Sequence, residues 1–100
     1  MSKRELIAQH REAILALAAK HGATDVRLFG SVARGDDDET SDVDVLARFP
    51  GATGWDVFAQ QFGFEEALAR LLGCKTHVVR EFSTMRPRLR AAIERDLVPL

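Results

Sequence analysis

Short apolar runs alternate with longer amphipathic segments along this chain, and the alternation limits the fold more than any other property of the sequence. Three runs have the length and the apolar composition of strands: residues 26–29, 43–49 and 76–80. Three segments carry apolar residues at helical spacing: residues 2–20, 55–72 and 84–96. This order predicts an α/β fold (α+β in stricter usage), with a small mixed β-sheet of three to four strands and helices packed on one side.

Helix boundaries and buried faces follow from the same patterns. Ser2 is the expected N-cap of the first helix. Gly63 is expected to bend or split the second helix, because a glycine costs about 1 kcal/mol inside a helix. The last helix should begin near Thr84, where Pro87 can occupy its first turn. Its expected buried stripe consists of Met85, Leu89, Ala92 and Ile93.

Aromatic residues are concentrated in the second helical segment. Phe58 and Phe62 are expected on its apolar face, together with leucines further along. For the group of Trp55, Phe58, Phe62 and Phe64, two interpretations stay open. The group could belong to the core, or an exposed subset of it could mark an interface with a partner.

Length, charge and cysteine content exclude several classes of protein. The 100 residues predict one domain, residues 1–100. The formal net charge of -1 provides no broad basic surface, so binding of nucleic acid through its phosphates is not expected. Cys74 is the only cysteine, which excludes an internal disulfide and favours a reducing cytoplasm. The longest apolar run, residues 13–19, is far shorter than the roughly 20 residues that cross a membrane.

Two polar motifs stand at the ends of predicted strands. Gly30 and Ser31 follow the first strand, where glycine permits close approach of a ligand and a helix start favours anions. Asp42 and Asp44 open the second strand and point to one face, roughly 6–7 Å apart at about 3.3 Å per residue. Mg²⁺ binds through one or two carboxylates plus substrate phosphates. The two motifs together therefore predict a phosphate and metal site.

The segments Gly30–Gly35 (Gly-Ser-Val-Ala-Arg-Gly) and Ser41–Val45 (Ser-Asp-Val-Asp-Val) resemble the signature of the DNA polymerase beta-like nucleotidyltransferase superfamily. Within it, the chain resembles the minimal nucleotidyltransferases (MNT), the antitoxin halves of HEPN/MNT toxin–antitoxin pairs. The resemblance covers nearly the whole chain, including the Leu71–Lys75 turn and the segment Arg86–Arg90.

The resemblance implies an Mg²⁺-dependent transferase that uses ATP as substrate. Gly30 and Ser31 would hold the triphosphate, and Arg34 could reach a phosphate. Asp42 and Asp44 would ligate the metal. An acidic protein can then bind an anionic nucleotide, because the metal offsets the charge of the triphosphate.

The chain departs from the family pattern on the third strand. Close relatives place a third carboxylate there, whereas His77 stands at that position in the stretch Lys75–Val79. A neutral histidine can accept a proton, but it suits Mg²⁺ poorly as a ligand. His77 is thus a candidate catalytic residue. Glu81 shares its strand parity but lies roughly 13 Å further along the chain, so it is not expected to replace the missing acid.

Three functions are compatible with these features. The first is an antitoxin enzyme that transfers AMP from ATP to a hydroxyl, a tyrosine, of a HEPN-type toxin. The second is a catalytically weak or inactive domain that neutralises its toxin by binding. The third is a nucleotidyltransferase that acts on a small molecule or nucleic acid. The absence of a second domain for the acceptor counts against this third function. No membrane partner is expected, and the chain could form homo- or hetero-oligomers.

Overall fold

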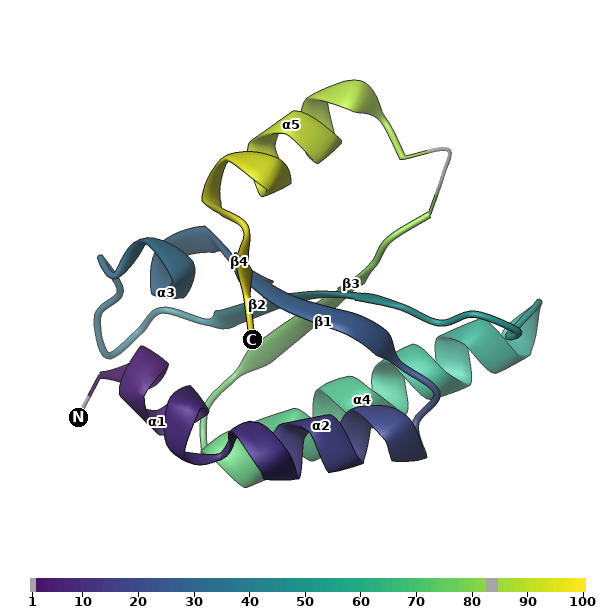
Figure 1. Ribbon diagram of the computed structural model, residues 1–100, viewed down its shortest axis with the longest axis horizontal. Helices are drawn as coiled ribbons and strands as arrows, with labels where there is room; N and C mark the ends of the chain where they lie inside the picture. The colour runs from purple at the N-terminus through teal and green to yellow at the C-terminus, as the bar shows by residue number, and fades with distance from the viewer. Residues whose placement is uncertain (1, 83–84) are drawn as a thin grey trace.

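The computed structural model describes residues 2–82 and 85–100, which form one mixed β-sheet flanked by helices (Figure 1). The helices are α1 (Lys3–Gln9), α2 (Arg11–Lys20), α3 (Gly30–Arg34), α4 (Trp55–Leu72) and α5 (Pro87–Asp96). The strands are β1 (Thr24–Phe29), β2 (Val43–Arg48), β3 (Thr76–Arg80) and β4 (Val98–Pro99). Their order in the sheet is β3–β2–β1–β4, which confirms the expected fold class.

Strand pairing brings the end of β1 and the starts of β2 and β3 to one end of the sheet. β1 and β2 are antiparallel, with Phe29 opposite Asp44. β2 and β3 are parallel, with Asp44 opposite His77, because α4 carries the chain back to the same end. The two-residue strand β4 pairs with the outer side of β1. The residues expected to carry chemistry therefore meet across three neighbouring strands.

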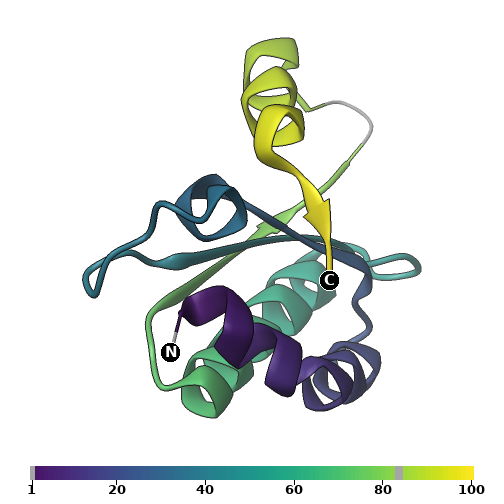
Figure 2. The ribbon, with the colours of Figure 1, turned by 60° about the vertical axis from the view of Figure 1, so that its left-hand side comes forward.

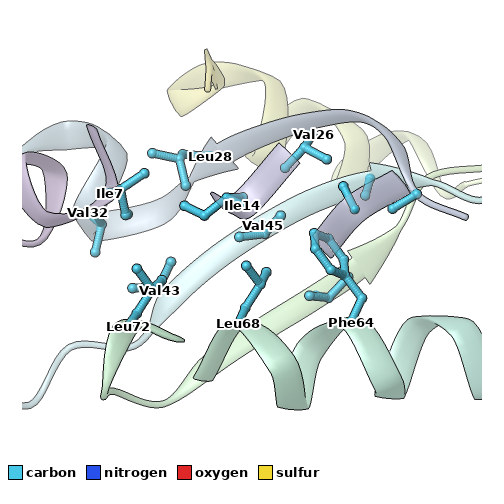
Figure 3. Packing of buried hydrophobic residues seen from close by; sticks show 14 of the residues in the cluster. Ile7, Ile14, Val26, Leu28, Val32, Val43, Val45, Phe64, Leu68 and Leu72 are labelled. Atoms are coloured by element: carbon cyan, nitrogen blue, oxygen red, sulfur yellow. The ribbon is translucent and has the colours of Figure 1, made fainter. Parts of the chain in front are cut away.

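Helices α1, α2 and α4 cover one face of the sheet, as expected (Figures 1 and 2). Val43 and Val45 of β2 point into this face and are buried. Phe64 and Leu68 of α4 and Ile14 of α2 belong to the same cluster (Figure 3). Each such side chain contributes roughly 1.5–3 kcal/mol when fully buried. This core fixes the orientation of β2, so its alternate residues must face the opposite side.

Helix α5 lies over part of that opposite face, so the helices do not all pack on one side (Figure 2). The second, smaller buried cluster consists of Leu46, Met85 and Ile93. Leu89 and Ala92 are exposed, so the expected stripe is wrong at these two positions. The helix begins at Pro87, and Thr84, its expected start, lies outside the described residues.

Two helical predictions differ from the structure. The first helix is divided at His10 into α1 and α2, although Ser2 caps α1 as expected and its hydroxyl accepts the Glu5 N–H. Of the bend or split expected at Gly63, the split is wrong, because α4 continues through this residue. A Cβ at position 63 would lie 3.0 Å from Nδ1 of His21, so the glycine makes room for that ring. Neither α4 nor any other helix in the described part of the chain is long and apolar enough to span a membrane.

The exposed edge of β3 is hydrogen-bonded to side chains of α4. The Gln61 amide donates to the backbone carbonyl of Val78 at 2.8 Å. The Val78 N–H donates to the Glu65 carboxylate at 2.9 Å. These two residues lie one turn apart on α4, so both polar groups of Val78 that face away from β2 are satisfied.

Candidate functional site

The predicted glycine–serine turn joins β1 directly to α3. Phe29 is extended, and Gly30 has a φ of +77°, a conformation that glycine adopts without strain. A Cβ on Gly30 would collide with the Asp44 carboxylate. Val32 is fully buried and anchors α3, while Ser31 is half-buried at its start. The absence of a side chain at position 30 therefore lets the turn lie directly against Asp44.

The two predicted carboxylates lie at the start of β2. Asp42 immediately precedes the strand, and Asp44 is its second residue. Because Val43 and Val45 point into the core, Asp44 faces the opposite side of the sheet, as the alternation predicts. The register places His77 beside it on β3. The structure thus brings together Gly30, Asp42, Asp44 and His77.

His77 makes a direct contact with the first of these carboxylates. Its Nε2 lies 2.9 Å from Oδ2 of Asp42. The His77 side chain is 46% exposed and that of Asp42 is 33% exposed, so the pair lies at the open surface of the site. The contact involves only Oδ2 of Asp42, so Oδ1 is not used in the bond to His77.

The charge of Asp44 is incompletely compensated. Burial raises the pKa of its carboxyl above the ordinary value. His77 has the next largest influence and lowers this pKa, whereas the charge of Asp42 raises it and that of Arg34 lowers it. An additional cation between Asp42 and Asp44 would stabilise the ionised carboxylate.

Arg34 lies at the end of α3 and is paired with two carboxylates. Its Nη1 is 2.7 Å from Asp96 on α5, and its Nε is 3.1 Å from Asp36. These hydrogen bonds, first that of Asp36 and then that of Asp96, raise the pKa of the guanidinium. Asp96 was not singled out in the sequence, because no local motif marks a residue that is 62 positions away from its partner.

The donor set at this end of the sheet fits a hard divalent cation. Within residues 2–82 and 85–100, no three His, Cys, Asp or Glu side chains are already arranged around a metal position. Mg²⁺ does not need such a cage, because it keeps several waters and binds one or two carboxylates plus substrate phosphates. Asp42 and Asp44 provide the carboxylates, and the Gly30 turn lies directly against Asp44 because position 30 carries no side chain.

Glu81 is committed to a different cluster and does not extend this site. Its carboxylate is 2.7 Å from Arg27 and 2.6 Å from Arg48, with Arg90 at 3.6 Å. The hydrogen bond from Arg27, followed by that from Arg48, lowers the pKa of Glu81 to about 2, although burial opposes this. This agrees with the expectation from strand spacing that Glu81 does not join the candidate site.

Comparisons with known proteins identify the family of this chain. The family model described as "Nucleotidyltransferase domain" matches residues 9–99. Two proteins of Methanocaldococcus jannaschii, named "Putative protein adenylyltransferase MJ1379" and "Putative protein adenylyltransferase MJ0128", are each 30% identical over 95 residues. Each alignment covers 95% of this chain and 91% of the relative.

Two solved structures share the fold. One, described as "Structure of putative minimal nucleotidyltransferase", is 44% identical with a TM-score of 0.73, and the match covers 100% of this chain and 97% of the other. The second, described as "Crystal structure of the toxin-antitoxin with AMP-PNP", has a TM-score of 0.70 at 17% identity. That match covers 88% of this chain and 69% of the other, and it concerns the fold alone.

Proposed function

The chain belongs to the nucleotidyltransferase domain family, and we propose that it is a Mg²⁺-dependent adenylyltransferase that acts as an antitoxin in the cytoplasm. It transfers AMP from ATP to a tyrosine hydroxyl of a HEPN-type toxin. Relatives named as protein adenylyltransferases support a protein acceptor. The pairing of the same fold with a toxin and AMP-PNP in a solved structure supports the choice of toxin and nucleotide.

The observation that carries the proposal is the position of Gly30 against Asp44. A phosphate-binding turn and a carboxylate pair would each be weak evidence alone. Here the turn at the end of β1 lies against the carboxylate at the start of β2, where a Cβ would not fit. A nucleotide triphosphate on the turn would thus lie beside Asp44, as transfer requires.

Each residue has a distinct role in this proposal. The backbone at Gly30 and the hydroxyl of Ser31 bind the triphosphate, and Arg34 exchanges one of its carboxylate partners for a phosphate. Asp42 and Asp44 would hold Mg²⁺, which would supply neutralisation of the charge that develops during transfer. The acceptor oxygen bonds to the α-phosphorus, and pyrophosphate leaves.

His77 is the candidate acceptor of the hydroxyl proton. A proton on its Nε2 is held by Asp42 across 2.9 Å, which leaves Nδ1 free to accept another. The exposed position of the ring allows an acceptor side chain to approach. His77 would therefore supply the general base that a third carboxylate supplies in relatives.

The test uses purified toxin and ATP labelled at the α-phosphate. The wild-type protein should transfer label to the toxin only when Mg²⁺ is present, and Mg²⁺ with ATP should raise its Tm. The double variant Asp42→Ala/Asp44→Ala should lose both responses. A matched control, Asp37→Ala/Glu39→Ala, removes two charges from the neighbouring loop and should keep both. An undiminished ATP response in the Asp42/Asp44 variant would contradict the site.

A second candidate function is neutralisation of the toxin by binding alone. It is favoured by His77, which stands opposite Asp44 where the family resemblance implies a carboxylate, and which already bonds Asp42. If the wild type neutralises toxin activity without transferring label, and the Asp42/Asp44 variant neutralises it equally, the binding function is the correct one. Loss of neutralisation together with transfer supports the enzyme.

A further inference from the structure

Three aromatic side chains form an exposed stripe on the first half of α4. Trp55 is 86% exposed, Phe58 48% and Phe62 58%. Neighbouring ring centroids are 5.9 Å and 6.4 Å apart, so the rings contact one another in series. Phe64, by contrast, is fully buried. The α4 stripe, defined as Trp55, Phe58 and Phe62, is therefore the exposed subset that the sequence left open.

The α4 stripe is large for a surface feature of a small protein. At about 150–250 Å² for each aromatic side chain, the three exposed fractions correspond to about 400 Å². Contiguous apolar patches of this size often mark interaction sites. Burial in the core cannot explain the stripe, because the opposite side of α4, with Phe64 and Leu68, already packs against the sheet.

The α4 stripe lies far from the candidate active site. α4 ends at the end of the sheet where β3 begins, and Phe58 lies roughly 20 Å from Leu72 at 1.5 Å per residue. In Figure 1 the start of α4 and the helix α3 are at opposite sides of the molecule. α4 also covers the face of the sheet that Asp44 does not face. A molecule bound to the stripe would leave Asp44 accessible.

We propose that the α4 stripe binds the same stripe of a second copy of this chain, with the two α4 helices antiparallel about a two-fold axis. A two-fold interface must be self-complementary. With the axis between residues 58 and 59, Trp55 faces Phe62 of the other copy, and Phe58 faces the small, exposed Ala59. Large and small side chains therefore alternate across the contact.

The charges on α4 are compatible with this arrangement. The positions level with Asp56, Glu65 and Glu66 in the other copy are 61, 52 and 51, so no carboxylate of α4 lies level with another. The two stripes supply about 800 Å², to which the polar rim adds, against roughly 1,200–2,000 Å² in stable complexes. Because the aromatic area lies below this range, we expect a weak, reversible dimer in the micromolar range.

The first test uses the single tryptophan as its probe. Trp55 is the only tryptophan of the chain, so fluorescence reports on the stripe alone. Its emission should shift to shorter wavelength as the protein concentration rises through the dimerisation range, in parallel with the mass from sedimentation. Trp55→Ala should weaken dimerisation by roughly 100-fold, because each dimer loses two of its six aromatic side chains, and tryptophan is the largest of them. Leu89→Ala, on an exposed residue of α5, is the control and should leave it unchanged.

The second test determines the register. In a Cys74→Ser background, Ala59→Cys should cross-link efficiently with a short bifunctional maleimide. Glu66→Cys should not, because antiparallel pairing places its two copies roughly 22 Å apart at 1.5 Å per residue. The reverse pattern would overturn the antiparallel arrangement.

Two further outcomes would overturn the proposal. One is a wild-type protein that stays monomeric, with constant Trp55 emission, up to about 500 µM, well above the micromolar range of small interfaces. The other is a dimer that Trp55→Ala and Phe62→Ala leave intact. A monomer that binds purified toxin only with Trp55 present would assign the stripe to that partner. The proposal does not depend on AMP transfer, so loss of activity in other variants does not affect it.

Discussion

Replacing Glu81 by glutamine should remove the negative charge at the centre of an arginine cluster and lower the free energy of unfolding. The Glu81 side chain is 7% exposed and is bonded to Arg27 and Arg48. Its pKa falls from 4.5 to about 2, and each pKa unit corresponds to about 1.4 kcal/mol. The full shift amounts to about 3 kcal/mol. Because Arg48 is 56% exposed, water screens one of the two pairs, so we expect a loss of about 2 kcal/mol at neutral pH.

The loss of stability in Glu81→Gln should depend on pH in a direction that follows from the pKa shift. The pKa of Glu81 is lower in the folded protein than in the unfolded chain, so its contribution is present above about pH 5. It is lost as the pH falls from 4.5 towards 2. The difference between wild type and Glu81→Gln should therefore shrink to less than about half of its neutral value at about pH 3.

Urea unfolding at several pH values measures this difference directly. The control is Glu66→Gln, which breaks the exposed pair with Arg70 and should cost less than about 0.5 kcal/mol. The rise in Tm with Mg²⁺ and ATP should persist in Glu81→Gln, because Glu81 lies outside the candidate site. A loss that is equal at about pH 7 and about pH 3 would refute the electrostatic explanation.

Three further predictions concern the site itself. Gly30→Ala should lower the free energy of unfolding by about 1–2 kcal/mol because of the positive φ, and it should abolish the rise in Tm with Mg²⁺ and ATP because the new Cβ displaces Asp44. Gly51→Ala is the control, since Gly51 also has a positive φ (+81°) but free space around it, and it should keep the rise. An equal rise in Tm in both variants, measured by calorimetry, would contradict the collision with Asp44. His77→Asp should raise Mg²⁺ affinity in titration calorimetry, or Mg²⁺-dependent transfer, by adding a carboxylate opposite Asp44; unchanged values in both would argue against the position of His77 at the metal. Asp44→Asn should raise the Tm of the ligand-free protein, because burial raises the pKa of Asp44 and its ionisation therefore destabilises the fold. The gain should grow as the pH rises through the range in which the carboxyl ionises. A lower Tm than that of the wild type at neutral pH would contradict this explanation.

Local patterns were sufficient for the elements that hold the site. Residues 42–45 alternate aspartate with valine, so the buried valines fix the face on which Asp44 lies. The turn at Gly30 was also readable, because a strand ended there at a residue that permits positive φ. Both predictions depended on neighbours within a few positions, which a sequence displays directly.

Long-range contacts decided the predictions that were wrong or missing. A glycine inside a helix indicates a bend or a split, but α4 is not split at Gly63, and the ring of His21, 42 positions earlier, fills the space that a side chain would occupy. β4 has only two residues, and its pairing with β1 across the length of the chain leaves no periodicity to detect. Periodicity also placed Phe58 and Phe62 on the apolar face of α4, whereas the sheet contacts the face that carries Phe64.

The side chains that bond Val78 have a consequence for how this protein behaves in a crowded solution. An open sheet edge is a template on which further strands can add, and repeated addition leads to aggregates. Gln61 and Glu65 already occupy the outward N–H and carbonyl at the centre of β3, so an incoming strand would have to displace them. The burial of Phe64 and Leu68 holds α4 in place, and that same packing keeps the two blocking groups at the edge. A chain whose outer strand is sealed in this way can remain dispersed at concentrations where an unprotected β-edge would polymerise.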